Sequence, residues 1–197
     1  MLLNLSRLFI IYIFYASSIA NAKSDSKTLE GKTAPHWSLK TFEGKFEHLG
    51  NYTAPENKKF KNKDGRKVVV QSFFASWCQP CIKEIGELQK IQEEFSENDI
   101  KFFLINLTDY FRNKDGATKK FKNAPNAEEF LKEKGLDKIT VVNDPTGRTA
   151  RSYNISDVLP RLFILDKYRT IRKEETGLCP TCLSDELVPL LDRLLEE

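Results

Sequence analysis

The sequence is poor in the residues that build metal sites and disulfide scaffolds. Its 197 residues include only four cysteines, two histidines and one methionine. Four cysteines in a chain of this length do not form the dense network of a small disulfide-stapled protein. Two histidines leave few ligands for a site that holds several metal ions. We therefore expect an ordinary hydrophobic core to hold the fold together.

Strong net charge and long apolar runs are also missing. The net charge is +3, from 31 basic and 28 acidic residues, which is too balanced to indicate nucleic-acid binding. The longest uncharged N-terminal run, residues 8–22, has about 15 residues and includes polar ones, whereas a membrane span needs about 20. What is present is 14 Phe, 6 Tyr and 2 Trp, enough to bury a core and to exclude a disordered chain.

The N-terminus has the pattern of an export signal. Arg7 supplies positive charge, an apolar stretch runs from Leu8 to Ala16, and Ala20 and Ala22 are small residues at a cleavage site. We expect residues 1–22 to be a signal peptide cleaved after Ala22, with an uncleaved membrane anchor as the alternative. All four cysteines remain in the exported part, where disulfides can persist.

After a polar arm at 23–32, strand and helix patterns alternate through a domain at 33–197. The expected order is a hairpin, then strand, helix, strand, helix, strand and a short helical turn, and then a second hairpin and a terminal helix. This order predicts an α/β fold with a central sheet and helices on both faces. The expected ranges are 34–46, 67–74, 82–95, 100–107, 126–135, 139–143, 146–153, 161–176 and 187–195, with exposed loops at 51–67 and 111–125.

A Cys-x-x-Cys motif lies between a buried strand and an amphipathic helix. Cys78 and Cys81 would stand at the start of that helix, where unpaired backbone N–H groups and the helix dipole stabilise a thiolate. Pro80 fits a first turn. The alternatives are a static disulfide or half of a zinc site, but a zinc ribbon needs its second pair about 15–20 residues on. We therefore expect redox chemistry at this pair.

The segment 69–84, VVQSFFASWCQPCIKE, resembles the TlpA/ResA family of exported thiol–disulfide oxidoreductases. The resemblance runs from Gly31 to the last helix. It is strengthened by Asp144-Pro145, Leu159-Pro160 and the strand at 163–166. It implies a thioredoxin fold, in which a central mixed sheet is flanked by helices and preceded by an N-terminal β-hairpin.

The resemblance also implies roles for the residues that match. Cys78 would attack the target disulfide and Cys81 would resolve the mixed disulfide. Pro160 would be a cis-proline beside the sulfurs, and the Leu159 backbone would pair with the target. Glu84, one helical turn after Cys81, would move a proton, unless it is only a solvated carboxylate. Trp77 would border the reactive sulfur, and Arg161, where the family often has Thr, would lie near the docking face.

The same resemblance predicts a function. The protein would act in a bacterial periplasm or another extracytoplasmic space. It would reduce disulfides of exported proteins, for example in cytochrome c maturation, without a cofactor, metal or nucleic acid. A membrane-bound donor would return its electrons. The alternatives are a thiol oxidase of the same fold and a non-enzymatic metal-handling chaperone, which would use His36 or His48.

A second Cys-x-x-Cys, Cys179 to Cys182, is not part of the family pattern. It follows Gly177 at the end of the last strand, and the strand order predicts that it emerges at the same end of the sheet as Cys78. Three interpretations stay open: a local structural disulfide, a second redox couple that exchanges with the first pair, and a zinc site joining all four sulfurs.

Overall fold

The computed structural model describes residues 28–62, 65–179 and 183–197. The expected signal peptide, residues 1–22, lies outside this part of the chain. Within the described residues no helix is long and apolar enough to cross a membrane.

Seven strands form one mixed sheet in the order β2-β1-β5-β4-β3-β6-β7. The inner strands β3, β4 and β5 are parallel, whereas β6 and β7 are antiparallel additions at one side and the β1–β2 hairpin is antiparallel at the other. The strands are β1 (Ser38–Lys40), β2 (Phe46–His48), β3 (Val68–Phe74), β4 (Ile100–Asn106), β5 (Thr140–Asn143), β6 (Arg161–Leu165) and β7 (Ile171–Thr176).

The helices connect and cover these strands. The longest, α1, runs from Gln79 to Glu94 between β3 and β4. The C-terminal helix α6 (Val188–Glu196) follows a short helical turn, η2 (Leu183–Leu187), and has Pro189 in its first turn. The others are η1 (Leu49–Asn51), α2 (Thr108–Asn113), α3 (Lys119–Lys122), α4 (Ala127–Glu133) and α5 (Arg148–Ser152).

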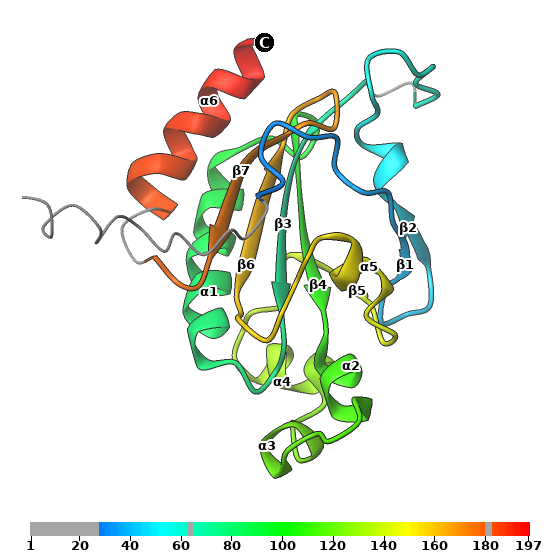
Figure 1. The fold of residues 1–197 in the computed structure, drawn as a ribbon. Helices are drawn as coiled ribbons and strands as arrows, with labels where there is room; N and C mark the ends of the chain where they lie inside the picture. The colour runs from blue at the N-terminus through cyan, green and yellow to red at the C-terminus, as the bar shows by residue number, and fades with distance from the viewer. Residues whose placement is uncertain (1–27, 63–64, 180–182) are drawn as a thin grey trace, which may run out of the picture.

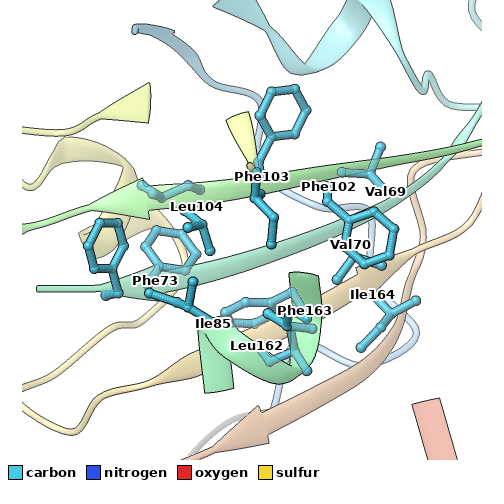
Figure 2. Packing of buried hydrophobic residues seen from close by; sticks show 14 of the residues in the cluster. Val69, Val70, Phe73, Ile85, Phe102, Phe103, Leu104, Leu162, Phe163 and Ile164 are labelled. Carbon is cyan, nitrogen blue, oxygen red and sulfur yellow. The ribbon is translucent and has the colours of Figure 1, made fainter. Parts of the chain in front are cut away.

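The sheet is central because its inner strands are apolar on both faces. Every residue of β3 is buried, as are six of the seven in β4, which is the pattern of strands covered on both sides. Figure 2 shows side chains of β3, β4 and β6 packed with Ile85 of α1 into a continuous core. The predicted mixed sheet with helices on both faces and an N-terminal hairpin is confirmed.

Side chains of β3 point alternately to the two faces of the sheet, and their contacts show which helix covers which face (Figure 1). Ser72 hydrogen-bonds to Glu84 of α1, so the even-numbered side chains face α1. Gln71 accepts a hydrogen bond from Trp37, and Phe73 contacts Tyr153 at the end of α5, so the odd-numbered ones face the opposite layer. The cysteine helix therefore lies on one side of the sheet and α5 on the other.

Three local expectations need revision. The first strand begins at Ser38 rather than Ala34. The loop expected at 111–125 contains α3 and the end of α2. Part of the expected polar arm is bound to the sheet, because the Gly31 N–H donates to the Ile171 carbonyl at 2.8 Å and the Leu29 N–H donates to Glu174 at 2.8 Å.

Candidate active site

The first cysteine pair lies where β3 turns into α1. Cys78 is the N-cap residue of the helix, and its Sγ accepts a hydrogen bond from the Cys81 N–H at 3.3 Å. Pro80 occupies the first turn, where a missing N–H costs little. The two sulfurs form a disulfide with a Cα–Cα distance of 5.3 Å, and both residues are at most 3% exposed.

This position favours thiolate chemistry at Cys78. The free N–H groups of the first turn and the positive end of the α1 dipole surround its sulfur, and both stabilise negative charge there. Cys81 lies one turn further into the helix. The N-cap position therefore favours Cys78 as the nucleophile of the reduced pair, with Cys81 within bonding distance of it, and both roles stay predictions.

Glu84 is buried on α1, one helical turn after Cys81. Its side chain faces the sheet rather than solvent, with 2% exposed, and Ser72 Oγ donates a hydrogen bond to its carboxylate at 2.5 Å. Burial raises the pKa of Glu84 to about 7, an effect that the Ser72 hydrogen bond opposes and the charge of Glu175 reinforces. The alternative of a solvated carboxylate is therefore wrong. A carboxyl that titrates near neutral pH can both give and take a proton.

The peptide bond between Leu159 and Pro160 is cis, as expected. It immediately precedes β6, whose first residue Arg161 pairs with Phe73 at the end of β3, so it lies at the cysteine end of the sheet. The Pro160 carbonyl accepts the Gly177 N–H at 2.8 Å. Within the described part of the chain, the Leu159 N–H and C=O have no hydrogen-bond partner, which leaves both groups for an extended segment of a target. That role stays a prediction.

Trp77, directly before the reactive cysteine, is held by aromatic residues that the sequence analysis did not single out. Its ring packs edge-on against Phe111 of α2 at 5.3 Å and lies 4.6 Å from Phe121 of α3. Ser76 also anchors the segment, since its Oγ donates to the Pro125 carbonyl at 2.7 Å. The β4–α4 connection therefore forms one wall of the site. Aromatic residues at 111 and 121 within an otherwise basic stretch were the available signal.

Arg161 lies at the cysteine end of the sheet, where the docking face was expected, but its side chain is not available for docking. Its side chain is only 9% exposed and forms an ion pair with Glu174 of β7, the same carboxylate that receives the Leu29 N–H. A buried, paired guanidinium is not free to meet a partner. Arg161 therefore stabilises the β6–β7 hairpin rather than lining a docking face.

The second cysteine pair is described only in part. Thr176 pairs with Arg161, so the chain leaves β7 at the cysteine end, as predicted. The next residues cross towards α1, where Leu178 and Ile82 border the same surface hollow. Cys179 is half-buried and disulfide-bonded, and Cys182 lies outside the described residues. The structural and redox interpretations, like the zinc site, stay untested.

Comparison with known proteins supports this assignment. The model of the AhpC/TSA family matches residues 31–174. Sporulation thiol-disulfide oxidoreductase A of Bacillus subtilis (strain 168) is 27% identical over 173 residues, which cover 87% of this chain and 90% of that protein. Thiol-disulfide oxidoreductase ResA of Geobacillus thermodenitrificans (strain NG80-2) is 24% identical over 147 residues, covering 75% of this chain and 69% of that protein.

Among solved structures, one described as a thiol:disulfide interchange protein DsbE from Chlorobium tepidum matches with a TM-score of 0.62 and 23% identity. The match covers 85% of this chain and 99% of that one. At this identity the likeness concerns the fold alone, and it confirms the expected thioredoxin fold.

Proposed function

Because the chain belongs to the AhpC/TSA family and is a thiol–disulfide oxidoreductase of the ResA type, we propose that its Cys78–Cys81 pair reduces disulfides of specific exported proteins. The observation that carries the proposal is the position of Cys78 at the start of α1, the helix that also contains the buried Glu84. The Leu159 N–H and C=O, which have no hydrogen-bond partner among the described residues, supply a place for the target chain.

The reaction begins with the reduced dithiol. The Cys78 thiolate attacks one sulfur of the target disulfide, forming a mixed disulfide and releasing one target thiolate, which takes up a proton. Cys81 then loses its proton and attacks the Cys78 sulfur, releasing the second target thiolate, which is also protonated. Two electrons and two protons pass to the target, and the protein is left in the disulfide form that the structure contains.

Glu84 takes the Cys81 proton in the second step. Its carboxyl lies one helical turn from Cys81 on the buried side of α1. Burial raises its pKa to about 7, so the ionised and neutral forms are both populated near neutral pH. This is the condition under which a general base both accepts a proton and returns it.

The cellular setting completes the proposal. In this proposal residues 1–22 direct export, and the domain at residues 33–197, with residues 29 and 31 bound to its sheet, acts in a bacterial periplasm or comparable space. A membrane-bound dithiol donor reduces the Cys78–Cys81 disulfide after each turnover. Cytochrome c maturation, in which cysteines must be reduced, is the process that we favour for the target.

A trapping experiment tests the proposal. In Cys81→Ser the resolving sulfur is missing, so a mixed disulfide between Cys78 and the target should accumulate and be identified by mass spectrometry of non-reduced complexes. Cys78→Ser is the matched control and should trap nothing. Replacing Cys179 and Cys182 by serine in the Cys81→Ser background removes competing thiols. A protein that forms no Cys78 adduct in either trapping background contradicts the reductase function.

A further inference from the structure

Three lysines of α3, the short helix that packs against Trp77, are exposed to solvent. Lys119, Lys120 and Lys122 are exposed, whereas Phe121 between them is half-buried and contacts the Trp77 ring. Phe121 therefore packs the helix against Trp77, and the other three residues are exposed and positively charged. We call these three lysines the basic rim.

The charge of the basic rim is not neutralised locally. Neighbouring basic residues have carboxylate partners: Arg112 pairs with Asp109, and Lys114 pairs with Asp157 at 2.9 Å. No carboxylate of the described residues lies within ion-pair distance of the three rim lysines. Exposed like charges held close together repel one another, and a bound acidic group relieves that repulsion.

The basic rim is joined directly to the reactive cysteine. The Lys120 ammonium lies 4.6 Å from the centre of the Trp77 ring, and Trp77 is followed by Cys78. The Lys114–Asp157 ion pair also joins the connection between β4 and α4, which contains the basic rim, to the loop that ends in the cis-proline. Val158 in that loop is 50% exposed. A target segment paired with the Leu159 backbone thus has an apolar contact at Val158 and positive charge beside its disulfide.

We infer that the basic rim selects target proteins that carry acidic residues close to their disulfide bond. The inference rests on the proposed function, since it names the kind of target that the Cys78 site accepts. Positive charge beside the point of attack raises the local concentration of an acidic target and orients it before the disulfide exchange begins. A surface that only attracted a membrane would need no connection to the nucleophile.

The chain contains its own control for this inference. Residues 58–61 repeat the tetrapeptide Lys-Lys-Phe-Lys, again with exposed lysines and a half-buried phenylalanine. This copy precedes β3, whereas Cys78 follows β3, so the two copies lie at opposite ends of the sheet (Figure 1). Matched substitutions in the two copies change the net charge of the protein equally. Only those at residues 119–122 change the charge beside the cysteine pair.

The experiment measures kcat/KM for reduction of three synthetic peptides by the full-length reduced protein. Each peptide contains one disulfide and differs only in flanking residues, which are Glu, Gln or Lys. At low salt we expect the Glu peptide to exceed the Gln peptide by roughly 10-fold. The ratio should fall towards one as salt shortens the screening length from about 30 Å at 0.01 M to about 8 Å at 0.15 M.

Variants assign this preference to the basic rim. Lys119→Gln with Lys122→Gln keeps the Lys120–Trp77 contact and should lower the Glu-to-Gln ratio about 5-fold, and Lys119→Glu with Lys122→Glu should reverse the preference to the Lys peptide. Lys58→Gln with Lys61→Gln should keep the wild-type ratio. A wild-type ratio near one, or an equal drop in the control, overturns the inference. The inference is also overturned if the Lys119→Gln, Lys122→Gln variant loses binding to anionic phospholipid vesicles but keeps the wild-type Glu-to-Gln ratio.

Failure of the proposed function gives a different result. A wild-type protein that reduces none of the three peptides faster than Cys78→Ser is not a disulfide reductase. A protein that reduces all three equally is a reductase without the selectivity inferred here.

Discussion

Glu84 links the core of the protein to its chemistry. A carboxylate with 2% of its surface exposed loses most of its hydration, and a single hydroxyl, Ser72 Oγ, compensates for only part of that loss. The protein thus contains an acid that is costly to ionise one helical turn from Cys81. The cost can be measured as a pH dependence of stability and of rate.

The stability of the oxidised protein should decrease as pH rises. Glu84 ionises near pH 4.5 in the unfolded chain but keeps its proton to about pH 7 when folded, so the folded state binds more protons between these values and loses stability with increasing pH. Between pH 5 and pH 8 we expect wild type to lose on the order of 2–3 kcal/mol more than Glu84→Gln, at about 1.4 kcal/mol per pKa unit. Urea unfolding at both pH values measures this, and parallel losses would contradict the buried-acid assignment.

Removing the Ser72 hydroxyl should raise the pKa of Glu84 further. The hydrogen bond from Ser72 favours the ionised carboxylate, so Ser72→Ala removes a stabilising contact from the charged form alone. The Glu84-dependent inflection in the pH profile of disulfide reduction should move to higher pH. Ser72→Thr, which keeps a hydroxyl, should restore the wild-type inflection. An inflection that stays in place in Ser72→Ala would show that the hydrogen bond does not tune the acid.

Among the elements, the β6–β7 hairpin depends on a buried charge pair. Arg161 and Glu174 are 9% and 11% exposed, so neither charge is well solvated alone. We expect Arg161→Ala to cost about 3 kcal/mol of unfolding free energy because it leaves Glu174 without its partner. The double variant Arg161→Met with Glu174→Leu should recover most of that loss. Chemical denaturation in a double-mutant cycle measures both, and additive losses would contradict a coupled pair.

Elements with a clear hydrophobic period could be predicted from the sequence. The stripe in α1, the apolar runs of β3 and β4 and the cap at Asn126 each determine one element locally, and each is present. The short helices α2 and α3 were missed because six and four residues are too few to show a period. Their helical form depends on Phe111 and Phe121 packing against Trp77, a contact between distant parts of the chain.

The candidate site also has parts that the local sequence predicts and parts that depend on contacts between distant residues. Cys78 and its helix are specified within a few adjacent residues. Helical spacing placed Glu84 one turn after Cys81, but its proposed role came from the family resemblance. The burial of Arg161 could not be inferred, because its partner Glu174 lies across the hairpin and is itself bonded by Leu29 from the distant N-terminal segment. The β4–α4 connection likewise contributes to the site through its packing against Trp77, which no local sequence pattern predicts.

At the scale of the whole molecule, the sheet has two distinct ends. Cys78, the cis-proline, the basic rim and the exit of β7 lie at one end, whereas the loop before β3 lies at the other (Figure 1). Active sites of sheets with parallel inner strands gather where the strands terminate, because connecting loops meet there. The proposed catalytic site and the proposed target-selecting lysines therefore lie at the same end of the sheet.

The two copies of Lys-Lys-Phe-Lys, one at each end of the sheet, allow the two ends to be compared experimentally. Two copies of one tetrapeptide have the same intrinsic side-chain reactivity, the same size and the same number of amines. Any difference between them in chemical labelling or cross-linking therefore reports on their surroundings alone. The chain contains an internal reference against which events at its catalytic end can be calibrated within a single sample.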